Sequence, residues 1–288
     1  MNLCDYNTIR DLLARHGFHF SKSMGQNFLI DPEVPRRIAE ASGADAGCGV
    51  LEIGPGIGPL TAELAQRADK VVSVELDRAL LPVLAETMAP YPNVEVVPGD
   101  VLKLDLTAIA AEKFQGLTPI VCANLPYNVT SPILEKLVES PCFTAFTVMI
   151  QREVARRLCA PQGSSEGGSF SLFLQYYMKP ELLFDVPPEK FLPAPKVTSA
   201  VIRCVRRERP AVDVADESFF FKVMRGGFLL RRKTLANSLS AALPGIPKES
   251  IQQAIADMGL PAAVRGEQLT LEDFAALSAA LGREADGD

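Results

Sequence analysis

The chain has 288 residues, of which 48% are hydrophobic and 22% charged, as expected for a globular protein of one large or two modest domains. No run approaches the about 18 apolar residues of a membrane span, and residues 1–20 have no secretory core. We therefore expect a cytoplasmic protein without membrane contact. With only His16 and His19, and six cysteines without a C-x-x-C pair, neither a metal site nor a disulfide framework is expected.

Apolar patterns along the first half of the chain alternate between strands and helices. A helix is expected over 7–16, followed by an aperiodic stretch. A second helix is expected to begin at Asp31-Pro32, with Asp31 as its N-cap and Pro32 in its first turn, and to end at Gly43. Strands are predicted at 48–53, 70–75, 93–97, 119–123 and 145–150, with helices at 60–67, 79–88 and 131–139. This alternation predicts an α/β fold whose parallel sheet is covered on both faces.

The second half is less regular. Residues 182–186 and 199–205 are predicted to form an antiparallel pair that closes the sheet, on either side of a proline-stiffened loop. Helices are expected at 153–159 and 170–177, separated by a flexible loop over 162–169, and then at 216–228, 233–241, 248–258 and 271–281. These patterns divide the chain into a catalytic domain over 1–208, with an N-terminal helical extension, and a helical domain over 209–288.

A glycine-rich turn ends the first predicted strand of the sheet. Gly54, Gly56 and Gly58 stand on alternate positions, as at the nucleotide pockets of parallel α/β sheets. The dinucleotide pattern G-x-G-x-x-G would require glycine at Pro59, and no Lys-Ser/Thr pair follows the turn. The turn therefore favours a ligand without a pyrophosphate.

Two carboxylates follow the next strands at positions suited to an adenosine. Glu75 ends the second strand, where it can accept both ribose hydroxyls, and Asp100 follows the third, where it can accept the adenine amine. Acids also cap helices at such positions, but the combination with the glycine turn describes an adenosine pocket without phosphates. S-adenosylmethionine fits that description.

The segment Asn124-Leu125-Pro126-Tyr127 ends the fourth strand and indicates the methyl acceptor. The Asn124 side-chain oxygen and the Leu125 carbonyl could each accept one N–H of a purine amine, which aims the nitrogen lone pair at a methyl donor. Tyr127 offers a flat face to an extruded base, a contact worth about 1–3 kcal/mol. No histidine base is needed, because the nitrogen loses its proton readily once it is alkylated. An Asn-capped turn with a core tyrosine is the alternative. Cys122 could suggest a cysteine nucleophile for carbon methylation, but it lies inside the strand and away from this corner, so we interpret it as a core thiol.

Motifs along nearly the whole chain make it similar to the bacterial small-subunit type of the ribosomal RNA adenine N6-dimethyltransferase family. They are Gly25-Gln26-Asn27-Phe28-Leu29, Glu52-Ile53-Gly54-Pro55-Gly56, Glu75-Leu76-Asp77, Gly99-Asp100, Asn124-Leu125-Pro126-Tyr127, Phe191-x-Pro193-x-Pro195-Lys196-Val197-x-Ser199 and Arg231-Arg232-Lys233-Thr234-Leu235. The resemblance implies a class I methyltransferase sheet of seven strands with a small helical C-terminal domain. It also implies dimethylation of two adjacent adenosines near the 3′ end of small-subunit ribosomal RNA, during subunit biogenesis.

The same resemblance implies roles for individual residues. Tyr127 and Phe191 would hold the target adenine from its two faces, with Asn124 orienting the amine. Gly167-Gly168 stands where the family usually has Tyr-Gly, which removes an aromatic role for that loop. The residues expected to contact the cofactor are Asn27, Leu29, Gly54, Glu75, Asp100 and Asn124, to which the glycine turn adds Gly56.

The net charge of −6 requires that any RNA-binding surface be local. Nine bases and four acids lie between Arg203 and Lys233, and Arg152, Arg156 and Arg157 form a second group. Such runs are often only solvated surface, but in an acidic chain they favour an RNA contact. The expected RNA-binding residues are Arg225, Arg231, Arg232 and Lys233.

Three functions remain open on these observations. The leading one is dimethylation of small-subunit RNA in an assembling 30S particle by a monomer. The second is methylation of large-subunit RNA of the kind that confers macrolide resistance, which the acidic balance and the Phe191 and Arg231 motifs disfavour. The third is a ribosome-assembly checkpoint in which methylation is secondary.

Overall fold

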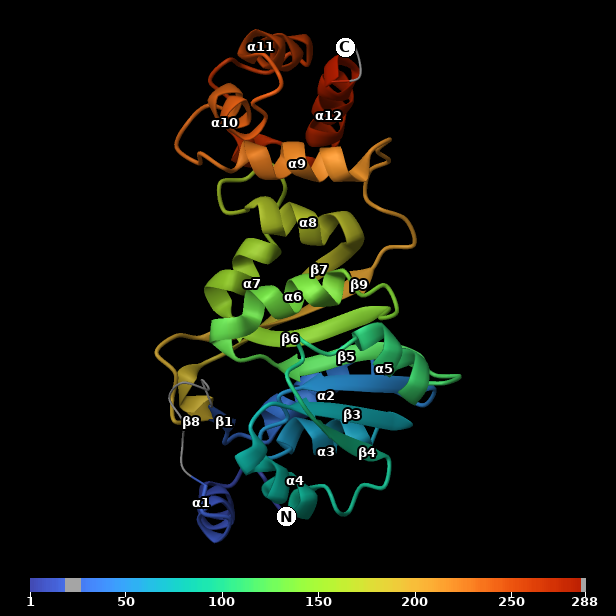
Figure 1. Ribbon diagram of the computed structural model, residues 1–288. Coiled ribbons are helices and arrows are strands. Elements are labelled where there is room, and N and C mark those ends of the chain that lie inside the picture. Colours follow the sequence, from blue (N-terminus) through green and yellow to red (C-terminus); the bar gives the residue numbers. More distant parts are fainter. Residues whose placement is uncertain (19–26, 286–288) are drawn as a thin grey trace. The chain divides into compact units, whose positions relative to one another are not determined.

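The computed structural model describes residues 1–18 and 27–285, and the chain forms two compact units (Figure 1). The first unit comprises Met1–Ala155 and Glu181–Arg206, and the second comprises Arg156–Pro180 and Arg207–Asp288. Residues 156–180 thus join the C-terminal helices, whereas the sequence suggested a single cut after residue 208. The assignment of catalysis to 1–208 and of RNA contact to 209–288 stays a prediction.

The sheet has seven strands in the order β4-β3-β2-β5-β6-β9-β7, which confirms the expected fold class. Neighbours from β4 to β6 are parallel, and β9 runs antiparallel to β6 with Gln151 opposite Ser199. The predicted strands at 182–186 and 199–205 are neighbours at the edge of the sheet. The strands are β2 (Cys48–Ile53), β3 (Lys70–Glu75), β4 (Val94–Pro98), β5 (Thr118–Asn124), β6 (Ala145–Gln151), β7 (Met178–Val186) and β9 (Ser199–Arg206).

The central strands are apolar because both faces of the sheet are covered. All six residues of β2 are buried, as is typical of a strand in a two-sided parallel sheet. On one face, Val50, Val71 and Cys122 form a core with Ile38 of α2 and Leu64 of α3. The helices outside the second unit are α1 (Tyr6–Arg15), α2 (Glu33–Ser42), α3 (Pro59–Ala65), α4 (Leu81–Thr87), α5 (Leu106–Lys113) and α6 (Thr130–Val138), while α7 (Arg152–Leu158) spans the junction.

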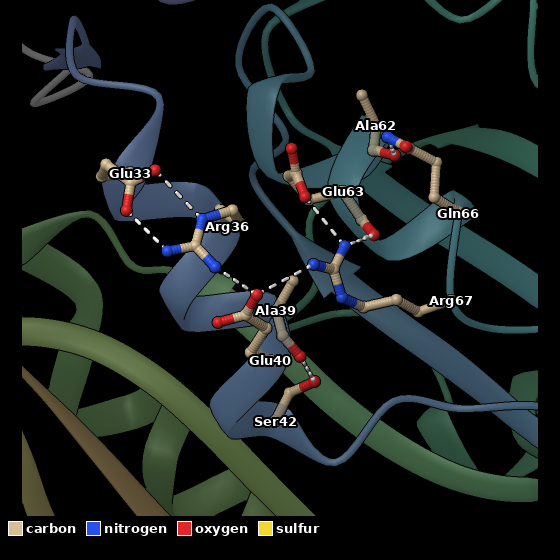
Figure 2. A network of polar contacts seen from close by, with 9 residues as sticks. All are labelled: Glu33, Arg36, Ala39, Glu40, Ser42, Ala62, Glu63, Gln66 and Arg67. Carbon is tan, nitrogen blue, oxygen red and sulfur yellow. Dashed lines mark hydrogen bonds and ion pairs between the residues drawn. The ribbon is translucent and has the colours of Figure 1, made fainter.

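Figure 2 shows a polar network that joins α2 to α3 on the solvent side of this core. Arg36 pairs with Glu33 at 2.6 Å and with Glu40, and Arg67 pairs with Glu40 at 3.5 Å and with Glu63 at 2.8 Å. Several of these side chains are half exposed, and exposed pairs contribute about 1 kcal/mol or less each. The apolar contacts beneath, rather than the network, therefore hold the two helices against the sheet.

Three local features differ from the sequence-based expectations. Helix α5 was not predicted, although Asp105 caps it by accepting the Ala108 N–H at 3.0 Å. Asp31 does not cap α2 in the usual position, because Pro32 is the N-cap and Asp31 accepts the N–H of Glu33. The aperiodic stretch and the proline-rich loop contain two short strands, β1 (Phe28–Leu29) and β8 (Phe191–Leu192), which pair with each other.

The second unit is helical and is built around aromatic side chains. Phe173 and Tyr176 of α8 contact Phe221 of α9, with ring centroids 5.4 and 5.1 Å apart. Its helices are α8 (Ser169–Tyr177), α9 (Glu217–Gly227), α10 (Leu235–Ala242), α11 (Lys248–Asp257) and α12 (Leu271–Ala285), close to the predicted ranges. Across residues 1–18 and 27–285, no helix combines the length and the apolar character needed to cross a membrane.

Candidate active site

A cavity of about 230 Å³ opens where β2, β3, β4 and β5 end, at the carboxyl edge of the parallel strands in the first unit. All of the predicted catalytic and cofactor-binding residues line this cavity. Gly25 and Gln26, from the same expected motif as Asn27, lie outside the described residues. The predicted residues that line the cavity are Asn27, Leu29, Gly54, Gly56, Glu75, Asp100, Asn124, Leu125, Tyr127 and Phe191.

The glycine turn has the backbone conformation that its sequence suggested. Gly54, Gly56 and Gly58 have φ angles of 68°, 64° and 94°, in the left-handed region that L side chains rarely adopt. The Gly54 N–H donates to the Val74 carbonyl at 2.9 Å, which anchors the turn to β3. A Cβ atom on Gly56 would lie 3.3 Å from the Phe28 ring. Gly54 and Gly56 therefore present backbone without a side chain to the cavity.

Glu75 is fixed at the end of β3 by two backbone donors. Its Oε1 accepts the Asp77 N–H at 2.8 Å, and its Oε2 accepts the Gly56 N–H at 3.3 Å. Only 6% of the residue is exposed. Burial raises the pKa of Glu75 above its ordinary value, although the two N–H donors act in the opposite direction. The carboxylate keeps lone pairs for ligand hydroxyls, which suits the ribose contact expected of it.

Asp100 is held at the end of the neighbouring strand. Its Oδ1 accepts the Leu102 N–H at 3.0 Å, and Lys103 Nζ lies 3.8 Å from its Oδ2. The Gly99 N–H donates to the Glu75 carbonyl at 2.8 Å, which ties this corner to β3. Glu75 and Asp100 therefore face one cavity from adjacent strand ends, as the adenosine hypothesis requires.

The corner from Asn124 to Tyr127 is anchored at both ends. The Leu125 N–H donates to the Met149 carbonyl at 3.1 Å, and the Tyr127 and Ser199 hydroxyls are 2.6 Å apart. Burial raises the pKa of Tyr127, so its hydroxyl stays protonated at neutral pH. Burial likewise raises the pKa of the fully buried Cys122, which supports its interpretation as a core thiol.

The β1–β8 pair brings Asn27, Leu29 and Phe191 to the cavity from segments far apart in the chain. Leu29 lies opposite Phe191 in this pair, and the Ile30 N–H donates to the Lys190 carbonyl at 2.9 Å. Only 3% of Phe191 is exposed, so the surface that it offers to a base is the part that lines the cavity. Two residues per strand are too few for a periodic signal, so only the family motifs pointed to these positions.

Sequence reasoning missed two acidic residues of this cavity: Asp77, which was noted only as part of the motif that ends β3, and Glu52. Glu52 is 1% exposed, lines the cavity from β2, and was noted only as part of the motif before the glycine turn. With Glu75, Asp77 and Asp100 it makes four acids among the described residues that line the cavity, which include no lysine, arginine or histidine. The signal that could have found Glu52 is a lone acid in an otherwise apolar buried strand.

Several of the bases between Arg203 and Lys233 make contacts within the fold. Fewer positive charges are therefore available to RNA than the sequence suggested. Arg206 donates to the carbonyls of Leu137, Val138, Ser140 and Phe143 around the end of α6. Arg207 donates to the carbonyls of Gln175 and Met178, and Arg203 is packed beside Gly43. Arg206 and Arg207 are occupied in this way because helix ends leave carbonyls without partners.

The four predicted RNA-binding residues are exposed in the second unit. Arg231 contacts Glu267 at 3.4 Å and the Ser165 carbonyl at 3.1 Å, so part of its guanidinium is engaged. Arg225, Arg232 and Lys233 complete this exposed basic group. In the loop expected to be flexible, Gln162 also accepts the Leu271 N–H at 2.8 Å.

Comparison with known proteins agrees with this geometry. The ribosomal RNA adenine dimethylase family model matches residues 17–279. Proteins called ribosomal RNA small subunit methyltransferase A from Bacillus mycoides and Bacillus cereus are each 48% identical over 279 residues, 96% of either chain.

Two solved structures extend the comparison. The 23S rRNA methyltransferase ErmE has a TM-score of 0.70 at 28% identity, covering 89% of this chain and 100% of its own. A dimethyladenosine transferase from Plasmodium falciparum has a TM-score of 0.75 at 24% identity, covering 89% and 98%, and shows the shared fold. The chain therefore belongs to the ribosomal RNA adenine dimethylase family and is an RNA methyltransferase with a class I fold.

Proposed function

We propose that this protein transfers methyl groups from S-adenosylmethionine to the N6 amines of two adjacent adenosines near the 3′ end of small-subunit ribosomal RNA. It would act as a monomer on an assembling 30S particle in the cytoplasm. The support is the family match, the name carried by relatives that are 48% identical, and the cavity described above.

One observation supports the donor more than any other, namely the charge of the cavity. Four acidic side chains and no basic one line it among the described residues, and the glycine turn leaves backbone exposed beside them. Such a lining repels phosphate groups and favours a cation that also carries hydroxyl donors. S-adenosylmethionine has a positive charge, two ribose hydroxyls and no phosphate, so the residues present fit it.

Each wall of the cavity then has a role in donor binding. Glu75 would accept the ribose hydroxyls, and Asp100 the adenine amine, while Asn27, Leu29, Gly54 and Gly56 would close around the adenosine. When bound, S-adenosylmethionine supplies an electrophilic methyl group on a sulfonium. The protein's contribution is to hold the acceptor nitrogen in line with that methyl group.

The acceptor would be oriented by the Asn124–Tyr127 corner. Asn124 Oδ1 and the Leu125 carbonyl would each accept one amine N–H, which directs the nitrogen lone pair toward the donor. Tyr127 and Phe191 would contact the two faces of the base. The displaced proton leaves to solvent after the new C–N bond forms, so catalysis rests on positioning and polarisation.

The test replaces Asn124 with alanine and uses the exposed neighbour Asn128, which is not among the cavity-lining residues, as the matched control. Small subunits are incubated with isotope-labelled S-adenosylmethionine, and the methylated adenosines are counted by mass spectrometry. We expect Asn124→Ala to lower transfer by about 10²–10³-fold or more without weakening subunit binding, because it removes an acceptor aimed at the reacting amine. Asn128→Ala should leave transfer unchanged. Full activity of Asn124→Ala would contradict the polarisation role.

The structural likeness to a 23S rRNA methyltransferase makes large-subunit ribosomal RNA a second candidate substrate. Primer extension on both ribosomal RNAs after the same incubation distinguishes the two, because dimethylated adenine blocks reverse transcription. A block only in small-subunit RNA supports the proposal, and a block only in large-subunit RNA contradicts it. A checkpoint role in which methylation is secondary would appear as normal small-subunit assembly despite the loss of transfer in Asn124→Ala.

A further inference from the structure

The short β1–β8 pair carries residues from both halves of the proposed site. Asn27 and Leu29 would contact the methyl donor and Phe191 the acceptor base, and all three line the cavity. Leu29 lies opposite Phe191 in the antiparallel pairing. A shift of β8 relative to β1 would therefore displace the acceptor side of the site relative to the donor side. Misplacement of reacting groups by about 1 Å can cost about a hundredfold in rate.

The backbone by itself holds this pair weakly. Each strand has two residues, and the Ile30 N–H, which donates to the Lys190 carbonyl at 2.9 Å, extends the pairing by one position. A lone two-stranded ribbon is only marginally stable even when it is longer. The segment around β8 has few backbone donors of its own, because proline has no N–H and stands at positions 187, 188, 193 and 195. Packing buries Phe191, but apolar contacts are not directional.

An ion pair joins the two segments at the end of this short ladder. Lys190 Nζ donates to Asp31 Oδ2 at 2.6 Å, although the two residues are 159 positions apart. Asp31 Oδ1 accepts the N–H of Glu33, the first residue of α2, at 2.9 Å. Helix α2 packs on the sheet through the fully buried Ile38. The pair therefore ties β8 to the helix that continues from β1 and that is fixed to the core of the first unit.

Both partners are charged at neutral pH. The hydrogen bond from Lys190, and then the Glu33 N–H, lower the pKa of Asp31, and Asp31 in turn raises the pKa of Lys190. The side chains of Asp31 and Lys190 are 24% and 38% exposed, so solvent screens the pair in part. A contact of this kind changes an equilibrium by up to about fivefold. That is enough to alter the population of a ribbon that is itself marginally stable.

The place of the pair in the fold indicates a role beyond stability. Neither Asp31 nor Lys190 is among the described residues that line the cavity, so neither touches the reacting groups. The ladder that they close carries Leu29 on one strand and Phe191 on the other. Whatever holds that ladder shut also sets the distance between the donor side and the acceptor side.

We propose that Asp31 and Lys190 are positioning residues for methyl transfer, which lock β8 to β1 and so align Phe191 with the bound donor. The inference rests on the proposed function, in which Leu29 contacts the donor and Phe191 the target adenine. Loss of the pair would leave the donor site in place, because β1 stays joined to α2 along the chain. The acceptor side would be misaligned, so the rate of transfer would fall at unchanged donor affinity. A pair that only stabilised the fold would change neither quantity.

Two substitutions of Lys190 separate its charge from its stem. Lys190→Met removes the charge and keeps an unbranched apolar side chain, whereas Lys190→Arg keeps a cationic donor that can reach Asp31. Single-turnover transfer to small subunits at saturating S-adenosylmethionine measures the rate, and calorimetric titration measures donor affinity. We expect Lys190→Met to lower the rate by about two- to fivefold with donor affinity unchanged, and Lys190→Arg to recover most of that loss.

Further variants test the pair as a unit. Asp31→Asn keeps an acceptor for the Glu33 N–H but removes the charge, so it should match Lys190→Met, and the double variant should be no slower than either single variant. Glu189→Gln is the matched control, because it removes an exposed charge from the same turn. It should leave the rate unchanged.

Hydrogen exchange of the Ile30 amide reports the same contact without any activity. This N–H donates to the Lys190 carbonyl, so its exchange measures the opening of β8 from β1. Exchange should be about two- to fivefold faster in Lys190→Met and in Asp31→Asn. Lys190→Arg and Glu189→Gln should exchange like the wild type.

Three results would overturn the proposal. They are a wild-type rate in Lys190→Met, a Lys190→Arg variant as slow as Lys190→Met, and a rate loss matched by an equal loss of donor affinity. Absence of transfer to small subunits by the wild type would instead contradict the proposed function, and the inference with it. The Ile30 exchange does not depend on the substrate, so it distinguishes that failure from an ion pair that does not hold the strands.

Discussion

Tyr127 shows how a single side chain in the candidate site is held by a residue that lies 72 positions later in the chain. Ser199 is fully buried at the start of β9, and its hydroxyl is 2.6 Å from that of Tyr127. A buried hydroxyl pair of this kind contributes about 1–3 kcal/mol when one partner is removed. We therefore regard Ser199 as a positioning residue for the Tyr127 ring.

Removing either hydroxyl should disturb base positioning without affecting the donor. We expect Ser199→Ala and Tyr127→Phe each to lower the rate of methyl transfer about tenfold, with donor affinity unchanged. Because both remove the same hydrogen bond, the double variant should be no slower than either single variant. Single-turnover kinetics and donor titration measure the two quantities. Multiplicative rate losses would show that the hydroxyls act independently.

Glu52 also links the stability of the fold to pH, independently of any ligand. Burial, and then repulsion by Glu75, raise its pKa to about 7 in the folded protein, whereas an exposed glutamate has a pKa of about 4.3. The folded state thus binds this proton more tightly than the unfolded state does. The contribution of Glu52 protonation to the free energy of unfolding is full at low pH and is lost as pH rises from about 4.5 to about 7. The loss is of the order of 3 kcal/mol.

Thermal melts of the wild type and Glu52→Gln across this range test that linkage. The amide cannot ionise, so the variant should gain in melting temperature relative to the wild type as pH rises from about 5.5 to 7.5. Above that range the difference should be constant. Glu75 titrates in both proteins, so the difference reports Glu52 together with its coupling to Glu75. A difference that does not change with pH would show that Glu52 is not protonated in the folded state.

At the scale of elements, the second unit depends on one close approach of two backbones. A Cβ atom on Gly266 would lie 2.2 Å from the carbonyl oxygen of Gly227, at the end of α9. Backbone atoms cannot give way as a flexible side chain can. Glycine is therefore required here by packing, although the sequence around it gives no sign of this.

Gly266→Ala should destabilise the helical unit, and Gly245→Ala provides a matched control. Overpacking of this kind costs about 1–3 kcal/mol, so the melting temperature should fall by several degrees. A Cβ atom on Gly245 would meet no atom within 4 Å, so that variant should change stability by less than about 0.5 kcal/mol. Differential scanning calorimetry compares the two. Equal stability of both variants would contradict the tight contact.

For the whole molecule, RNA binding has to overcome a net charge of −6. Arg203, Arg206 and Arg207 are engaged within the fold, so the available positive charge is smaller than the sequence suggested. Arg232 and Lys233 are exposed in the second unit and are the strongest candidates for phosphate contacts. Counterion release then makes the affinity depend on salt.

Replacing Arg232 and Lys233 with glutamine should weaken small-subunit binding and lower the slope of log affinity against log salt by about 1–2. The control is the double variant Lys179→Gln with Lys248→Gln, which removes two exposed bases elsewhere in the same unit and changes the net charge by the same amount. Binding measured over a salt series separates a local contact from a general charge effect. Equal slopes for the two double variants would contradict a specific contact at 232–233.

The sequence by itself determined the parallel sheet, the glycine turn and most of the site. These features have local causes, because runs of apolar residues form buried strands and positive φ angles require glycine. The carboxyl ends of parallel strands meet at one edge of the sheet, so the order of strands along the chain is enough to bring Glu75, Asp100 and Asn124 together.

The tertiary structure alone decided which partners meet across the chain. It paired β1 with β8, engaged Arg206 at a helix end, and placed Ser199 against Tyr127. It also left Glu52 Oε1 without a partner among the described residues at the cavity floor. These outcomes depend on distances between residues far apart in sequence, and neither local propensity nor periodicity records such distances.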